Sequence, residues 1–139
     1  MCIASFDFSC DSPMSVALAV QLREGTKKAH TMAENTGFVS CFLKGVVDKA
    51  TYRNLVVDLY FVYLAMEEEI ERLTLEGHPV VSRISYPELN RRESLEEDLK
   101  FYFGTDWSDN LKPTRSAKAY AERIYHVAKQ NPELLIGHH

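Results

Sequence analysis

Apolar side chains recur at helical spacing through most of the chain, and the longest such stripe runs over residues 52–73. Because residues three and four apart share one side of an α-helix, this stripe predicts a long helix with one buried face. The charged residues within its second half are expected to form a solvated face, with Glu68 and Arg72 spaced for a weak surface pair. The apolar stripe consists of Tyr52, Leu55, Val56, Leu59, Tyr60, Tyr63, Met66, Ile70 and Leu73, and the charged residues are Glu67, Glu68, Glu69, Glu71 and Arg72.

Two helices are predicted before the long one. A similar pattern predicts a helix over 15–35, and a short apolar run between two glycines predicts a brief helix over 38–44. Their inward positions are Leu18, Leu22, Gly25, Ala29 and Met32 in the first helix, and Phe38, Cys41 and Phe42 in the second. Cys41 is therefore expected to be a small buried hydrophobe. Residues 1–13 show no sustained period and form a leader, whose role stays open between upstream sequence, a processed segment and an ordered cap.

An irregular connection and another helix are predicted after the long one. Glycine and proline residues break the helical pattern over 77–93. Ser94 and Glu97 are spaced as a capping box, in which two side chains satisfy the free amides of a helix start. A helix is therefore predicted over 95–103, ended by Gly104, which readily adopts a positive φ.

The last part of the chain is also predicted to be helical. A helix is expected over 116–130, with Trp107 folding back on the core from the loop before it. Its inward positions are Ala117, Tyr120, Ala121, Ile124 and Val127. Asn131 and Pro132 have the residue types of a helix start, so a new helix is expected from Pro132. Because the sequence shows no pattern of paired strands, the predicted fold class is all-α.

Composition narrows the class of protein. With 139 residues and 45% hydrophobic side chains, the chain can bury one ordinary core. Its net charge of -4 has the wrong sign for phosphate backbones, so no nucleic acid partner is expected. The richest apolar stretch, residues 55–66, is interrupted by Asp58 and is too short for a membrane span. Residues 1–13 carry no Lys or Arg and so lack the start of a secretory signal peptide, which favours a cytoplasmic setting.

One stripe on the first predicted helix has the residue types that suit an anionic ligand containing iron. Arg23, Lys27, His30 and Glu34 follow one another at steps of four, three and four, which places them on one helix face. A neutral imidazole is a common axial ligand of heme iron, and cations one and two turns away can pair with porphyrin propionates. Glu34, one turn beyond His30, can orient groups around the imidazole. The stripe predicts His30 as a metal ligand.

A plainer interpretation stays open at this point. A histidine among lysine and glutamate residues on a helix is commonly just solvent-exposed, and spacing does not distinguish this state from ligation. Tyr60, Tyr63 and Tyr120 can equally be ordinary core aromatics with satisfied hydroxyls. The sequence holds no glycine-rich phosphate loop, no serine nucleophile elbow and no paired His and carboxylate motif for a second metal.

Several segments, in consistent order, resemble heme oxygenases. The sequence LREGTKKAHTMAEN at residues 22–35 resembles the opening of these enzymes, in which the histidine shortly before AEN is the proximal iron ligand. The likeness continues through FLKG at 42–45, LYFVYLAMEEEIER at 59–72, YPELNRRESLEEDL at 86–99 and PELL at 132–135. It covers nearly all of residues 14–139 and is closest to the cyanobacterial and algal type, which takes electrons from ferredoxin.

The resemblance implies an activity and a set of site residues. The family binds heme b as both cofactor and substrate, and cleaves it with oxygen and electrons to biliverdin, carbon monoxide and ferrous iron. By this resemblance His30 holds the iron. The other matched positions are Arg23 and Lys27 near the heme propionates, Val39 and Phe42 in the pocket walls, and Tyr63 and Tyr120 in the catalytic hydrogen-bond network on the distal side.

The resemblance also leads us to expect a partial site. In the family a Tyr-Thr-Arg-Tyr-Leu-Gly-Asp stretch and a glycine-rich distal helix would follow residue 139, and the sequence contains neither. Residues 14–139 thus match the N-terminal part of a single domain, truncated before the distal helix, so weak heme binding and little or no turnover are expected. A non-catalytic heme-binding or sensing module, and a helical interaction domain without cofactor, remain as alternatives.

The implied electron donor points to an interaction surface. Ferredoxin, or another acidic donor, is expected to use a basic patch despite the negative net charge of the chain. The residues of this patch are Lys27, Lys28, Lys44, Lys49 and Arg53. The expected location is the cytoplasm, or the plastid stroma if the source is an alga.

Overall fold

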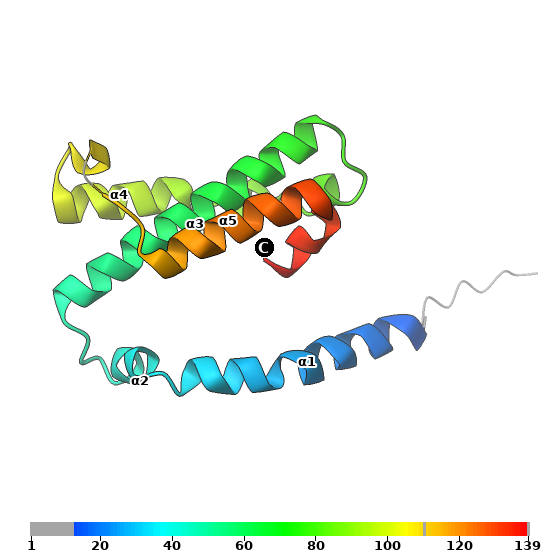
Figure 1. Cartoon of the computed structure of the whole chain (residues 1–139), viewed down its shortest axis with the longest axis horizontal. Helices are drawn as coiled ribbons and strands as arrows, with labels where there is room; N and C mark the ends of the chain where they lie inside the picture. Colours follow the sequence, from blue (N-terminus) through cyan, green and yellow to red (C-terminus); the bar gives the residue numbers. More distant parts are fainter. Residues whose placement is uncertain (1–12, 110, 139) are drawn as a thin grey trace, which may run out of the picture. The chain divides into compact units, whose positions relative to one another are not determined.

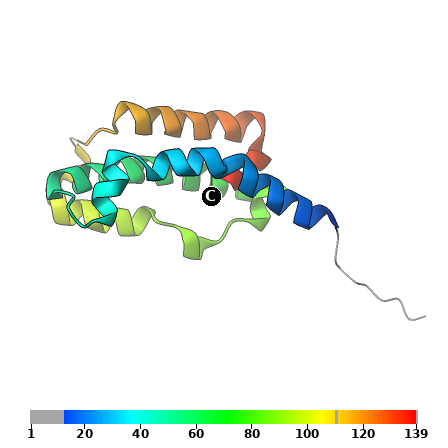
Figure 2. The same cartoon turned by 90° about the horizontal axis from the view of Figure 1, so that it is seen from below.

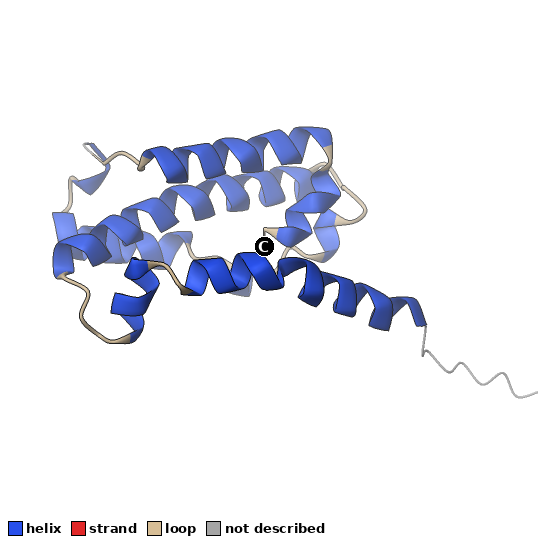
Figure 3. Ribbon diagram, turned by 60° about the horizontal axis from the view of Figure 1, so that its bottom comes forward, coloured by secondary structure: helices blue, strands red, loops and turns tan. Residues whose placement is uncertain are grey.

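The computed structural model describes residues 13–109 and 111–138, and their side chains from residue 20 onward. Within these ranges the chain forms helices and no strand, which confirms the all-α prediction (Figure 3). The chain divides into two compact units, Met1–Val47 and Asp48–His139, called here the N-terminal unit and the C-terminal unit. The predicted leader, with Cys2 and Cys10, lies outside the described residues except for Pro13.

The N-terminal unit contains helices α1 (Pro13–Glu34) and α2 (Gly37–Leu43), which agree with the two predicted helices (Figure 1). Local hydrogen bonds define their ends. The Asn35 side-chain amide donates to the carbonyl of Thr31 at 2.9 Å, and the Thr36 hydroxyl accepts from the first turn of α2. Cys41 is exposed, so the prediction that it is buried is wrong: no side chain of this short helix is buried.

The C-terminal unit is built on the long helix α3 (Lys49–Leu75), which begins at an Asp48 N-cap. Helices α4 (Arg92–Phe103) and α5 (Arg115–Gln130) pack on it from two sides, so that α3 lies between them (Figure 2). Burial therefore extends beyond the predicted stripe to Val57 and Ala65. Tyr52 and Leu59, both in the predicted stripe, are exposed instead.

Two clusters of buried side chains form the core of this unit. One joins the second half of α3 to α5, and the other joins the first half of α3 to α4 and Trp107. The Trp107 ring meets the Tyr60 ring edge-on, with the two ring centroids 5.0 Å apart. This contact confirms that Trp107 folds back on the core. The buried members are Ala65, Met66, Ile70, Leu73, Val81, Ile124, Val127, Ala128 and Leu135 in the first cluster, and Val56, Val57, Tyr60, Leu95 and Leu99 in the second.

Helix α4 is capped by a distant residue rather than by the predicted capping box. The Glu67 carboxylate on α3 accepts hydrogen bonds from the amides of Arg91 at 2.6 Å and Arg92 at 3.2 Å. The hydroxyl of Ser94 donates to the Arg91 carbonyl and caps no amide, so the capping box is wrong. At the other end Gly104 has a φ of 86°, a region that favours glycine, as predicted.

The charged side of α3 is only partly the solvated face that the sequence predicts, because Glu68 and Glu71 are exposed but Glu69 is not. Glu69 is buried, and its carboxylate lies 2.6 Å from the guanidinium of Arg72, which also pairs with Glu76 at 2.8 Å. The expected pair of Glu68 with Arg72 is therefore replaced. Glu68 instead accepts a hydrogen bond from the Tyr125 hydroxyl at 3.0 Å. Burial and this bond raise the pKa of Tyr125 to about 12.

The connections and the end of the chain consist of short 3-10 helices: η1 (Val81–Arg83), η2 (Pro87–Leu89), η3 (Trp107–Asp109) and η4 (Pro132–Gly137). The helix expected from Pro132 is thus present in 3-10 form, and it buries Leu135 completely. The start of α5 depends on Asp58, whose carboxylate accepts from the amide and the hydroxyl of Thr114 at 2.8 and 2.7 Å. Thr114 in turn caps α5.

Candidate functional site

The predicted iron ligand, His30, lies on α1 with its imidazole exposed. Its Nδ1 atom is 3.3 Å from Oε1 of Glu34, one turn further along the helix. The two side chains are 73% and 59% exposed, so a ligand can reach them in this unit. A carboxylate on Nδ1 fixes the ring orientation and leaves Nε2 as the nitrogen for a metal. The structure thus supplies the partner of Glu34 that spacing did not identify.

Two cations accompany the imidazole on α1. Lys27 and Arg23 stand one and two turns before His30, and both are exposed. The ammonium of Lys27 is 3.9 Å from the Glu24 carboxylate, a loose contact between exposed groups that contributes little to stability. Both cations are therefore available to an anionic ligand at the face that carries His30.

The predicted pocket-wall residues lie on α2 of the same unit. The Val39 amide donates to the Thr36 hydroxyl at 3.4 Å, and the Val39 side chain is half-buried. The Phe42 ring is 48% exposed and stacks on Phe38 with centroids 6.1 Å apart. The N-terminal unit thus contains every predicted heme-binding residue, together with an exposed aromatic surface.

The two predicted catalytic tyrosines lie in the C-terminal unit. Tyr63 is half-buried on α3 and packs against both core clusters. Tyr120 on α5 is 42% exposed, so its predicted inward position is wrong. Its hydroxyl lies 2.9 Å from Nδ1 of His138, a residue that the sequence did not single out. Eighteen residues and a change of helix separate this pair, so helical spacing contains no sign of it.

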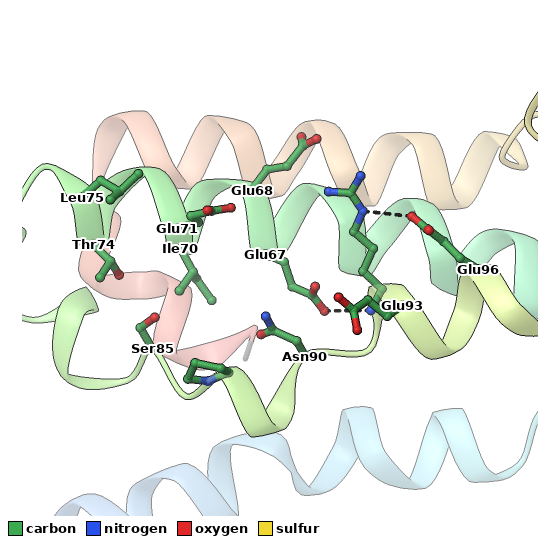
Figure 4. Close-up of a pocket in the computed structure, with 12 residues that line it drawn as sticks. Glu67, Glu68, Ile70, Glu71, Thr74, Leu75, Ser85, Asn90, Glu93 and Glu96 are labelled. Carbon is green, nitrogen blue, oxygen red and sulfur yellow. Dashed lines mark hydrogen bonds and ion pairs between the residues drawn. The ribbon is translucent and has the colours of Figure 1, made fainter.

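A groove of about 710 Å³ lies between α3 and α4 of the C-terminal unit (Figure 4). Five carboxylates line it, including Glu67, which points toward the start of α4, and Glu96, which pairs with Arg92 at 3.1 Å. None of the predicted site residues lines this groove. It is lined by Glu67, Glu68, Ile70, Glu71, Thr74, Leu75, Ser85, Pro87, Asn90, Arg92, Glu93 and Glu96.

No group of three or more His, Cys, Asp or Glu side chains in residues 13–109 and 111–138 is arranged to hold a metal ion. Over the same ranges, no helix combines the length and the apolar character that crossing a bilayer requires.

Comparison with known proteins identifies the family. A family model described as heme oxygenase matches residues 16–139. Heme oxygenase 1 of Synechocystis sp. is 58% identical over 125 residues, which cover 90% of this chain and 51% of that protein. Heme oxygenase of Pyropia yezoensis is 51% identical over 121 residues, which cover 87% of this chain and 50% of that protein. The chain spans about half the length of the curated relatives it matches.

Solved structures agree with this result. The crystal structure of heme oxygenase-1 from Synechocystis sp. in complex with heme matches with a TM-score of 0.80 and 57% identity, over 87% of this chain and 54% of that one. Heme oxygenase-2 from Synechocystis sp., in complex with heme and NO, matches with a TM-score of 0.81 and 43% identity, over 87% and 49%. By sequence and by fold, the chain therefore belongs to the heme oxygenase family.

Proposed function

We propose that this chain binds heme b through His30 and takes part in the oxidative cleavage of heme to biliverdin, carbon monoxide and ferrous iron. The observation that carries the proposal is the imidazole of His30, exposed on α1 and held through Nδ1 by Glu34. Support comes from membership of the heme oxygenase family and from the similar Synechocystis structure, which is a complex with heme. Heme, when bound, supplies both the iron that activates oxygen and the ring that is cleaved.

The residues around His30 would bind and orient this ligand. Arg23 and Lys27 would pair with the two propionates, because exposed cations on the same helix face neutralise carboxylates next to the iron ligand. Val39 and Phe42 would cover apolar parts of the ring, since Phe42 leaves almost half of its surface open. Glu34 would keep the imidazole in one orientation.

The tyrosines would act on the oxygen side of the reaction. Tyr63 and Tyr120 would hold water molecules that deliver protons, as the resemblance to the family implies. The Tyr120 hydroxyl has the polarity for this role, since it already forms a hydrogen bond with His138. Electrons would come from ferredoxin or another donor protein, in the cytoplasm or, for an algal source, in the plastid stroma.

A hemin titration of the chain tests the proposal. We expect a saturable, sharp visible absorption band for the unmodified chain, and at least about a tenfold loss of affinity with a changed band for His30→Ala, because the axial ligand is removed. His126→Ala is the matched control, since His126 is another exposed histidine on a helix and should leave the band unchanged. The same bound spectrum in His30→Ala would contradict His30 ligation.

A turnover assay then separates an enzyme from a heme-binding module. The heme complex is supplied with ferredoxin, ferredoxin reductase and NADPH, and biliverdin is followed by its visible absorption. Product that depends on His30 supports cleavage by this chain. Little or no product is expected, because the chain matches only part of the domain; biliverdin formation at the rate of a full-length heme oxygenase would contradict this expectation.

A further inference from the structure

The corner between α1 and α2 is closed by hydrogen bonds at the end of α1 (Figure 1). The last four carbonyl groups of an α-helix have no partner within the helix, and two of these carbonyls in α1 are each bonded twice. The backbone and side-chain amides of Asn35 donate to the carbonyl of Thr31 at 3.2 and 2.9 Å. The amide and the hydroxyl of Thr36 donate to the carbonyl of Ala33 at 3.2 and 2.9 Å. These four bonds stabilise the last turn of α1.

This last turn carries the carboxylate that contacts the predicted iron ligand. His30 and Glu34 are one helical turn apart, so their contact at 3.3 Å requires the backbone between them to be helical. Helix ends fray easily, and no described side chain of the N-terminal unit is buried, so packing within this unit does not hold the turn. The side-chain amide of Asn35 therefore helps to keep Glu34 beside the imidazole.

A pair of stacked rings orients a side chain of α2 in a similar way. Phe38 is half-buried, and its ring stacks on Phe42 with centroids 6.1 Å apart and an angle of 24° between the planes. Apolar side chains four residues apart on a helix stabilise each other, so the stack favours one orientation of the Phe42 ring. Phe42 remains 48% exposed, which leaves part of this ring free to contact a ligand.

We propose that Asn35 and Phe38 are positioning residues for heme binding. Asn35 keeps Glu34 beside His30, and Phe38 keeps the Phe42 ring in its stacked orientation. The inference rests on the proposed function and adds two residues that the sequence did not assign to the site. A site that is already in the competent arrangement binds more tightly, because affinity falls with the fraction of molecules that have this arrangement. Neither residue has to touch the ligand for this effect.

Amide hydrogen exchange of the heme-free chain tests whether Asn35 holds the turn. Asn35→Ala should speed the exchange of the amides of residues 31–34 about fivefold, because the last turn of α1 loses a hydrogen bond and frays. The control is Asn54→Ala, which removes an exposed asparagine side chain from α3 and should leave these amides unchanged. Equal exchange in the unmodified chain and in Asn35→Ala overturns the role of Asn35.

Hemin titrations test whether this turn matters for binding. Asn35→Ala should raise the Kd for hemin about fivefold, and Asn54→Ala should leave it unchanged. Because Asn35 acts through Glu34, adding Asn35→Ala to Glu34→Ala should raise the Kd no further. An unchanged Kd in Asn35→Ala, or a full additional loss in the double variant, overturns the proposal. Thermal unfolding of each variant shows that the C-terminal unit remains folded.

A second set of variants tests the ring stack. Phe38→Ala should raise the Kd for hemin about threefold, and Phe38→Tyr, which keeps the ring, should restore it. Leu43→Ala is the control on the same helix, since Leu43 is 77% exposed. In the Phe42→Ala background, Phe38→Ala should have no further effect. The circular dichroism of the heme band should change in Phe38→Ala and recover in Phe38→Tyr. Unchanged affinity and dichroism in Phe38→Ala, or additive losses with Phe42→Ala, overturn the role of Phe38.

The outcomes separate this inference from the proposed function. Hemin binding that depends on His30, but not on Asn35 or Phe38, overturns the positioning roles and leaves the proposed function. Hemin binding that does not depend on His30 overturns the proposed function, and the positioning roles with it. The exchange measurement on the heme-free chain still shows, in that case, whether Asn35 holds the last turn of α1.

Discussion

The two units differ in where they place their apolar side chains. In the N-terminal unit none of the described side chains is buried, and large apolar residues such as Leu22, Met32 and Phe42 are exposed. In the C-terminal unit two clusters enclose side chains such as Leu99 and Ile124 with no exposed surface. The difference indicates that the C-terminal unit encloses a core of its own, whereas the apolar and charged side chains of the N-terminal unit remain accessible.

The same substitution should destabilise the two units to very different extents. Leu99→Ala should lower the free energy of unfolding by about 3 kcal/mol, because it leaves a cavity in a closed core. Leu22→Ala, on a residue that is 59% exposed, should cost less than about 0.5 kcal/mol. Urea unfolding followed by circular dichroism and by Trp107 fluorescence measures both. Similar losses for the two leucines would contradict the contrast between the units.

A smaller effect is expected where a helix end depends on a distant carboxylate. Glu67→Ala should cost about 1.5 kcal/mol, because the amides at the start of α4 lose their acceptor. Glu71→Ala, an exposed glutamate on the same helix, serves as the control and should be nearly neutral. Thermal unfolding distinguishes the two variants. Equal melting temperatures would show that Glu67 does not stabilise α4.

In the N-terminal unit the corresponding carboxylate should affect binding rather than folding. Glu34→Ala should weaken heme binding about tenfold with little change in unfolding, because the imidazole loses the group that orients it. Glu24→Ala, which removes the loose partner of Lys27, is the comparison. Hemin titrations and melting curves are both needed. If Glu34→Ala lost stability but kept its heme affinity, Glu34 would support the fold of the N-terminal unit and not the binding of heme.

The smallest effect concerns pH and belongs to the C-terminal unit. The folded-state pKa of Tyr125 is raised to about 12 from an ordinary value of 10.0, by burial and by its bond to Glu68. The stabilisation is therefore complete below pH 10 and is lost as the pH rises toward 12. Tyr125→Phe should cost less than about 1 kcal/mol at pH 7 and should flatten the fall in stability above pH 10. Unfolding curves at several alkaline pH values check this, and an unchanged alkaline slope would disprove it.

Much of this fold is predictable because local signals define it. Helical periodicity, and the glycine and proline residues that interrupt it, predict the positions of the five α-helices of the described residues within a few residues. Gly104 ends α4 as expected. The predictions fail where a partner is distant in sequence. Glu69 looks solvated from spacing, yet it is buried beside Arg72. Glu68 is exposed as predicted, but it accepts from Tyr125 and does not pair with Arg72. Helical periodicity contains no information about which neighbouring helix covers which charge.

The candidate site also has one part that local spacing predicts and another part that it does not. The stripe from Arg23 to Glu34 is local, so spacing places its members together on α1, although only the structure shows that Glu34 contacts His30. Tyr120 has the period of an inward residue but is exposed, because the cover of α5 depends on α3 and η4. The bond between Tyr120 and His138 requires the chain to turn back at Pro132.

Carboxylates on α3 hold the first amides of both helices that pack on it: Glu67 for α4, and Asp58, through Thr114, for α5. This arrangement has a kinetic consequence, since neither acceptor is in place until α3 itself has formed. We expect α3 to be largely structured in the folding transition state, so that Asp58→Ala slows refolding more than it speeds unfolding, a ratio that chevron analysis measures. The C-terminal unit would then assemble in a fixed order, with α3 forming before the starts of α4 and α5.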